Sequence, residues 1–209
     1  VPARVTPDVV KEVREIIVNN NIKEKVIFDI TTFKANFINL YQQYPRTVKV
    51  STVHPLFGPG ARTPSKYTVA IIPIPGREGD SQYVKEFFRN LGFKIKIVNF
   101  KVHDEIVALT IGVSHTIGIL LAGLLPSTGI DGIEELSGTT FKYLMVHLKS
   151  ITYEDKEFLK YILLNDNVKR IIDRLRGILS LMVENPMEVL EDIDYLKKYW
   201  ELSEVEKVG

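Results

Sequence analysis

The chain has 209 residues, of which 45% are hydrophobic and 25% charged, and this is the composition of an ordinary globular protein with room for a sizeable core. Its 27 Lys and Arg residues balance 26 Asp and Glu residues, so no excess charge is present to attract nucleic acid or an anionic membrane. The absence of cysteine excludes disulfides, thiolate nucleophiles and zinc–thiolate sites, and it favours a cytoplasmic location.

The first hundred residues alternate between helical and strand patterns. Thr6-Pro7 is a helix-start signal, and apolar residues recur at helical spacing from there to Ile17. Strand patterns cover 25–30, 48–54, 67–74 and 94–99, and helical patterns cover 31–44 and 79–91. Short strands separated by helices or loops predict an α/β fold, with a mixed sheet rather than a purely parallel one.

The pattern changes near residue 100, and no convincing strand follows. Thr152 to Asp155 reads as a capping box, which predicts the start of a helix. Three loop signals separate other helical segments, namely Pro126-Ser127-Thr128-Gly129, Asn165-Asp166-Asn167 and Asn185-Pro186. We therefore expect an α/β domain over residues 1–100, followed by an all-helical domain over residues 101–209.

Residues 106–125 form a run of twenty residues without Lys, Arg, Asp or Glu. Its length permits a membrane span, but His115 near its centre and the lack of a cationic flank favour a helix buried on all sides in a protein core. The helical half offers few neighbours to cover such a helix, so we expect a second copy of the chain to complete the cover as an intimate homodimer.

His54 is the first candidate for chemistry. It stands at the carboxyl end of the strand predicted over 48–54, followed by Pro55 and a turn at Gly58-Pro59-Gly60, and α/β folds display catalytic groups at such positions. An imidazole titrates near neutral pH and suits proton transfer. The alternative is a loop histidine whose ring nitrogen is satisfied by a backbone carbonyl.

Thr31 and Thr32 follow the strand predicted over 25–30. A hydroxyl at this place can hydrogen-bond the imidazole of His54 and fix its tautomer. The alternative is that one of the two threonines only caps the next helix.

The other histidines are weaker candidates. His103 is most simply a helix-start residue, and His115 lies roughly 120° from it around a helix, so the two do not form a metal pair. A histidine in an apolar helix needs a partner, and a bound carboxylate is suitable for His115. His147 lies among apolar helical residues and is expected to be structural.

Taken together, these motifs resemble the prephenate dehydrogenase (TyrA) family of tyrosine biosynthesis. That family reads D-x-x-S-x-K, then H-P-[ML]-x-G, then H-D with a second His along an apolar helix, then a G-T-T-F-R-like segment. The chain has matching segments in the same order: Asp29-Ile30-Thr31-Thr32-Phe33-Lys34, His54-Pro55-Leu56-Phe57-Gly58, His103-Asp104 with His115, and Ser137-Gly138-Thr139-Thr140-Phe141-Lys142. The resemblance spans residues 1–170.

The resemblance implies a partial Rossmann-like sheet followed by a helical dimerisation domain. It also implies oxidative decarboxylation of prephenate or arogenate, with NAD or NADP as cofactor and no metal. His54 would accept the hydroxyl proton, and Thr32 would hold His54 in place. The resemblance also assigns His115, Lys142 and Gly58 to substrate binding. It assigns Thr31 and Pro55 to cofactor binding.

The chain departs from the family pattern at its front and at two side chains. Thr32 stands where Ser is common and Lys142 where Arg is common, and since Lys cannot form a bidentate fork, Lys149 is a rival for the same role. The family has a G-x-G-x-x-G segment ahead of the part that resembles Val1 to Ile17, and this sequence has none. We therefore expect Val1 to be an interior position of a longer protein. We also expect these residues alone to bind NAD(P) weakly.

Two further functions compete with the first. One is a non-catalytic dimerising or ligand-sensing remnant, and the other is a dehydrogenase of a different hydroxy acid. Intact His54, Thr32 and His115 favour the prephenate or arogenate dehydrogenase over a remnant, which has no chemical reason to keep them together. The H-P-x-x-G and G-T-T-F segments argue against the different hydroxy acid.

Overall fold

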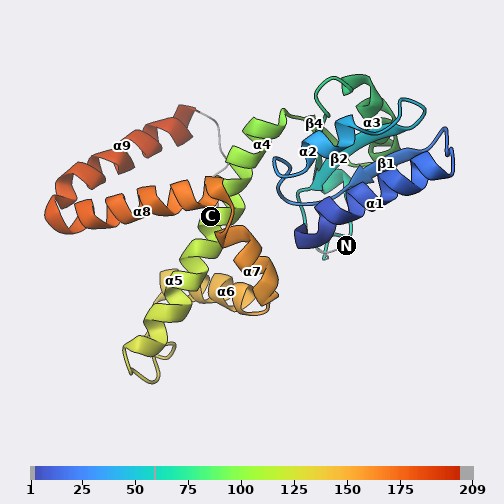
Figure 1. Ribbon diagram of the computed structural model, residues 1–209. Helices are drawn as coiled ribbons and strands as arrows, with labels where there is room; N and C mark the ends of the chain where they lie inside the picture. The colour runs from blue at the N-terminus through green and yellow to red at the C-terminus, as the bar shows by residue number, and fades with distance from the viewer. Residues whose placement is uncertain (1–2, 59, 203–209) are drawn as a thin grey trace.

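The computed structural model describes residues 3–58 and 60–202. The predicted beginning at Val1 and Pro59 of the predicted turn lie outside these residues. The strands occupy the first half of the described chain and helices make up the second half, so the expected fold class, α/β followed by all-α, is confirmed (Figure 1). The division into domains at residue 100 stays a prediction.

The sheet is mixed, as expected, with the strand order β1-β2-β3-β4. The strands are β1 (Val26–Asp29), β2 (Lys49–Pro55), β3 (Thr68–Ile72) and β4 (Lys94–Ile97). β1 pairs in parallel with β2, β2 pairs antiparallel with β3, and β3 pairs in parallel with β4. The carboxyl ends of β1 and β2 therefore lie at one edge of the sheet, beside the first residues of β3 and β4.

Helices cover both faces of the sheet. α1 (Thr6–Asn19) and α2 (Ile38–Gln42) pack on one face, and α3 (Ser81–Asn90) packs on the other. Because successive residues of a strand point to opposite faces, Val50 of β2 joins the first core and Val53 joins the second. Short 3₁₀ turns occupy Ala3–Val5, Pro64–Lys66 and Glu78–Asp80.

The helix predicted over 31–44 is wrong in its first half, because α2 begins only at Ile38. Apolar residues do recur there at helical spacing. However, the backbone N–H groups of Lys34 and Ala35 donate to the carboxylate of Asp104, which belongs to a distant helix. These bonds replace the local hydrogen bonds that a helix would need, so the segment before α2 is a loop.

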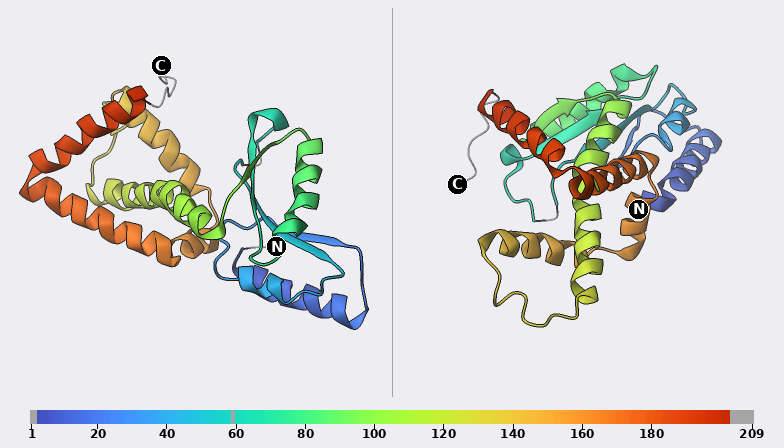
Figure 2. Two further views of the ribbon diagram at one scale, coloured as in Figure 1. Left: turned by 90° about the horizontal axis from the view of Figure 1, so that it is seen from above. Right: turned by 90° about the vertical axis from the view of Figure 1, so that its left-hand side faces the viewer.

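A long helical rod leaves the sheet and leads into the helical half (Figure 1). It consists of α4 (Phe100–Val107), a π-helical turn (Ala108–Gly112) and α5 (Val113–Ser127). The helices that follow are α6 (Thr139–Thr152), α7 (Lys156–Leu163), α8 (Asp166–Glu184) and α9 (Pro186–Leu202). α8 and α9 form a hairpin that points away from the sheet (Figure 2).

The helix start predicted at Thr152 is wrong. Thr152 is the last residue of α6, and its hydroxyl donates to the carbonyl oxygen of Lys149. The next helix is capped by Asp155 instead, whose carboxylate accepts the backbone N–H of Glu157. A carboxylate with this geometry satisfies one of the free N–H groups at a helix start.

Among the described residues, one helix has the length and apolar composition of a membrane span, the rod Phe100–Ser127. The described chain alone does not bury this helix on all sides, as expected from the few neighbours that the helical half offers. One side is tightly packed, since a Cβ atom at Gly118 would lie 2.6 Å from Cγ1 of Ile151. The opposite side is open, with Leu120 53% and Leu124 56% exposed. The homodimer that would cover this side stays a prediction.

Candidate active site

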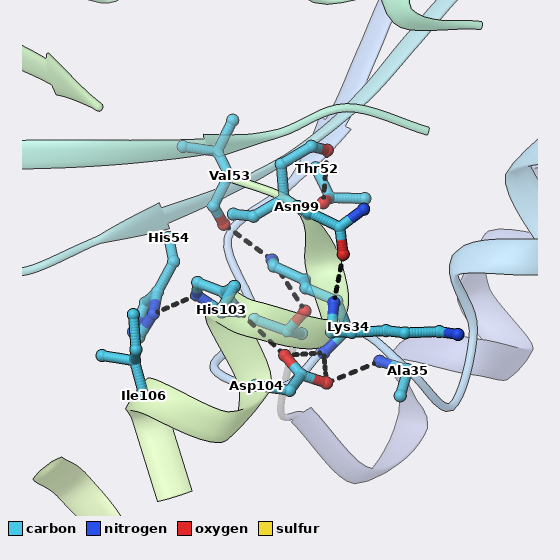
Figure 3. A network of polar contacts seen from close by, with 12 residues as sticks. Lys34, Ala35, Thr52, Val53, His54, Asn99, His103, Asp104 and Ile106 are labelled. Atoms are coloured by element: carbon cyan, nitrogen blue, oxygen red, sulfur yellow. Dashed lines mark hydrogen bonds and ion pairs between the residues drawn. The ribbon is translucent and has the colours of Figure 1, made fainter. Parts of the chain in front are cut away.

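β2 places His54 at the edge of the sheet, one residue before the strand ends. The residue is 6% exposed, and its Nδ1 lies 3.0 Å from Nε2 of His103, which belongs to α4. The two rings meet nearly edge to face, with centroids 5.1 Å apart (Figure 3). The helical half of the chain thus supplies a direct partner for the histidine of the sheet.

His103 is in turn held by its neighbour Asp104. Nδ1 of His103 lies 2.8 Å from Oδ1 of Asp104, and both residues are buried. A carboxylate accepts hydrogen bonds, so Nδ1 of His103 carries a proton, and when the ring of His103 is neutral its Nε2 is an acceptor. His54 must then donate from Nδ1, and its Nε2 keeps the lone pair. The series therefore fixes His54 in the tautomer that can accept a proton at Nε2.

Asp104 also joins α4 to the loop that follows β1. Its two carboxylate oxygens accept the backbone N–H of Lys34 at 2.9 and 3.0 Å, and Oδ2 accepts that of Ala35 at 2.8 Å (Figure 3). The buried carboxylate is thus satisfied by charge-assisted hydrogen bonds. It holds the loop that carries Thr31 and Thr32 in a fixed position relative to His103.

Lys34 is fully buried and contacts the strand residue that precedes His54. Its Nζ donates to Oδ1 of Asp29 at 2.7 Å and to the backbone carbonyl of Val53, the residue before His54, at 2.7 Å. Burial lowers the pKa of Lys34, and the carboxylate of Asp29 opposes that shift. The ion pair ties the end of β1 to the strand position that presents His54.

The surroundings of His54 keep its ring neutral. Burial lowers its pKa, the neighbouring His103 and Lys34 act in the same direction, and Asp104 opposes them, so the pKa falls from 6.5 to about 3. The ring nitrogen of His54 is therefore unprotonated at neutral pH, as a proton acceptor requires, but the lowered pKa also makes it a weaker base than a free imidazole.

His54 and His103 open onto a cavity of about 530 Å³. A cavity of this size and apolar lining suits a ring-bearing small molecule, with the histidines as its chemically active groups. The other lining residues are Pro55, Leu56, Phe57, Ala70, Lys96, Val98, Ile106, Val107, Thr110 and Ile111.

Among the described residues, no hydrogen bond joins His54 to either of the threonines predicted to orient it. The hydrogen bond of Nδ1 goes to His103, where we expected Thr32, and Thr32 is half-buried in the loop before α2. The hydroxyl of Thr31 donates to Asp29. Since α2 begins later, neither threonine caps it. The catalytic role of Thr32, the cofactor role of Thr31 and the substrate role of Gly58 stay predictions.

The residues predicted to bind substrate carboxylates lie outside this cavity. His115 of α5 has Nδ1 bonded to the carbonyl of Ile111 at 2.7 Å, and its Nε2 is buried without a partner in the described part of the chain. Lys142 is exposed on α6. Its rival Lys149 pairs with Glu134 at 3.3 Å. One copy of the chain does not bring these side chains to His54, and their substrate roles stay predictions.

His147 bridges two helices rather than facing the cavity. Its Nε2 lies 2.8 Å from the backbone carbonyl oxygen of Ser114, which joins α6 to α5. Because a carbonyl only accepts, this ring nitrogen is the donor.

Sequence reasoning missed the roles of His103, Asp104 and Lys34. We expected His103 to be only a helix-start residue, but it lies inside α4 and contacts His54 across 49 positions of the chain. One signal was present, since both His103-Asp104 and Lys34 belong to the segments that carry the family resemblance. Nothing local in the sequence pairs them with His54.

The fold, a Rossmann-like sheet followed by a helical half, is similar to that of solved prephenate and arogenate dehydrogenases. Prephenate dehydrogenase from Aquifex aeolicus, solved with hydroxyphenyl propionate and NAD+, matches with a TM-score of 0.74 at 17% identity over 95% of this chain and 72% of that chain. Arogenate dehydrogenase from Synechocystis matches with a TM-score of 0.62 at 14% identity over 98% of this chain and 77% of that one.

One curated relative is similar in sequence. A probable arogenate/prephenate dehydrogenase of Methanocaldococcus jannaschii is 26% identical over 135 residues, which are 63% of this chain and 29% of the relative. The chain thus matches less than a third of that protein's length. No protein-family profile matches the chain. The resemblance to the prephenate and arogenate dehydrogenases that the motifs indicated is confirmed.

Proposed function

We propose that this chain carries the proton-accepting and substrate-binding part of an NAD(P)-dependent prephenate or arogenate dehydrogenase of tyrosine biosynthesis. We further propose that the enzyme is cytoplasmic and works as a homodimer through its helical half. The observation that carries the proposal is the hydrogen-bonded series of His54, His103 and Asp104 at an apolar cavity. The names of the similar proteins support the same class.

The first task of the site is proton removal. Nε2 of His54 accepts the proton of the substrate hydroxyl. The imidazolium that forms donates from Nδ1 to His103, and His103 donates to the carboxylate of Asp104. The negative charge of Asp104 stabilises the new positive charge and keeps both rings oriented. His103 and Asp104 are therefore positioning residues for His54.

The remaining chemistry needs little from the protein. When bound, the nicotinamide accepts the hydride from the ring carbon that bears the hydroxyl. Loss of carbon dioxide from the opposite ring carbon breaks a carbon–carbon bond, and its electron pair completes an aromatic ring. The apolar walls orient the ring and exclude water, which strengthens the electrostatic contacts inside.

The described residues fit the nicotinamide end of such a cofactor and not its phosphates. β1 and β2 run in parallel and end side by side at the edge where α/β sheets take ligands, and Pro55 lines the cavity there. Thr31 and Pro55 are our candidates for this contact. The sequence contains no G-x-G-x-x-G, so we assign no residue to the pyrophosphate.

The test uses the protein encoded by the complete reading frame that contains these residues. Prephenate or arogenate is supplied with NAD+ or NADP+, and nicotinamide reduction is followed by absorbance. We expect His54→Asn to lower kcat on the order of 10²- to 10⁴-fold with little change in KM. His147→Asn is the matched control, since His147 only bridges α5 and α6.

Two results would contradict the proposal. One is the absence of nicotinamide reduction with either acid and either cofactor. The other is a His54→Asn variant with nearly normal kcat. Binding of the acid without turnover would instead favour the ligand-sensing remnant.

A further inference from the structure

Three residues form a row across the sheet, one on each of three neighbouring strands. His54 of β2 is in register with Ala70 of β3, and Ala70 is in register with Lys96 of β4. Side chains at in-register positions of neighbouring strands point to the same face of a sheet. Lys96 therefore lies on the same face as His54, two strand spacings or about 10 Å away between Cα atoms.

This row forms one wall of the cavity at His54. All three residues line it, and the small methyl group of Ala70 leaves space between the imidazole and the lysine. The facing side is apolar and includes Ile106, Val107 and Ile111 of the helical rod, so the cavity has a proton acceptor at one end, a cation at the other and an apolar middle.

The charge of Lys96 has no described counterpart within the chain. Among the described residues, no Asp or Glu lines the cavity, and the ion pairs of lysines involve other positions. Lys96 is exposed, so its ammonium group is hydrated until a ligand arrives. Since the pKa of His54 is lowered and its ring is neutral, Lys96 gives this cavity its positive charge at neutral pH.

We propose that Lys96 binds the side-chain carboxylate of the substrate and selects ring-bearing acids for this cavity. This inference rests on the proposed function and adds a specificity residue to it. A ring placed over Ala70 with its hydroxyl at Nε2 of His54 directs a substituent on the opposite ring carbon toward Lys96. The ammonium then forms a charge-assisted hydrogen bond with the carboxylate at the end of that substituent.

The test compares two small ligands that differ only in the carboxylate: 3-(4-hydroxyphenyl)propionate and 4-propylphenol. Binding to the complete protein is measured by calorimetry, without turnover. We expect the protein to prefer the acid about tenfold or more, and Lys96→Met to abolish this preference while the phenol binds as before. Lys96→Arg keeps a cation and should keep the preference.

Lys94→Met is the matched control, because Lys94 lies on the same strand and the same face, one pleat away, and does not line the cavity. The inference is overturned if Lys96→Met keeps the preference for the acid, or if it weakens both ligands equally. These results are separable from the proposed function. Turnover of prephenate with an unchanged KM in Lys96→Met refutes only the role of Lys96, whereas Lys96-dependent binding of the acid without turnover refutes only the dehydrogenase.

Discussion

The backbone N–H of Lys34 and the carboxylate of Asp104 are hydrogen-bonded at 2.9 and 3.0 Å although they lie 70 positions apart in the chain. This contact fastens the loop after β1 to the helix that carries His103. The same carboxylate accepts a hydrogen bond from Nδ1 of His103, so one buried group both positions a loop and sets the tautomer of the proton acceptor.

Asp104→Asn is predicted to impair catalysis more than binding. An amide can donate to Nδ1 of His103, which reverses the tautomer of His103 and then that of His54. We expect kcat to fall on the order of 10²- to 10⁴-fold with KM within a few-fold of its normal value, as measured by steady-state kinetics. Asp166→Asn, an exposed change at the start of α8, is the control. A normal kcat in Asp104→Asn would show that the tautomer is not set this way.

The stability of the protein is predicted to fall in acid because of His54. Its pKa is lowered to about 3 in the folded state, mainly by burial and then by His103 and Lys34, against 6.5 when unfolded. Between these values the unfolded chain binds a proton that the folded chain does not, so stability decreases as pH falls from about 6.5 towards 3. At pH 4.5 the contribution is about 2–3 kcal/mol.

Urea unfolding of the wild type and His54→Asn at pH 7.5 and 4.5 measures this contribution. His103 and Asp104 are present in both proteins, so the difference between the two proteins reports the loss of the His54 imidazole together with its contact to His103. The variant should lose less stability on acidification than the wild type. Equal losses would mean that the pKa of His54 is not lowered in the folded protein.

Gly118→Ala is predicted to destabilise the helical half. A Cβ atom there would lie 2.6 Å from Cγ1 of Ile151, so α5 and α6 would have to move apart, at a cost of about 1–3 kcal/mol. Gly123→Ala on the same helix is the control, because a Cβ atom there meets no atom within 4 Å. The control should gain about 0.5–1 kcal/mol through helix propensity. Thermal unfolding of both variants decides, and a stable Gly118→Ala protein would contradict the close packing.

Leu120→Arg is predicted to dissociate the homodimer that we propose. Leu120 is 53% exposed on the open side of the rod, and a buried unpaired guanidinium would oppose association there. Light scattering after size-exclusion chromatography should give a dimer mass for the wild type and a monomer mass for the variant. Leu91→Arg, at a leucine of 50% exposure beyond α3, should remain dimeric. A wild-type monomer would refute the predicted homodimer.

Local sequence patterns were sufficient to predict the strands of the sheet. Alternating apolar residues predicted β2, and its end at Pro55 predicted that His54 lies at the sheet edge. By contrast, the segment 31–37 has apolar residues at helical spacing, which predict a helix, but it is a loop. Its true conformation depends on Asp104, and a window of neighbouring residues does not contain that information.

From the sequence, only those features of the site that depend on adjacent residues could be predicted. The partnership of His54 with His103 joins a strand to a helix 49 positions away, and the register of Lys96 with His54 passes through a third strand. Such relationships arise from strand pairing and from the packing of α4. The resemblance to a family identified His103-Asp104 as a motif, but only the fold shows what it touches.

The π turn Ala108–Gly112 is equivalent to one extra residue inserted into a continuous helix. Removing that residue would rotate everything beyond it by about 100° around the axis. His103 and Asp104 would stay with the sheet, while Gly118 would turn away from Ile151. The extra residue therefore sets how far one end of the helix is rotated about its axis relative to the other. One end carries His103, and the other helices pack against the other end. A single-residue deletion there would change how the two halves are oriented while leaving His54, His103 and Asp104 themselves in place.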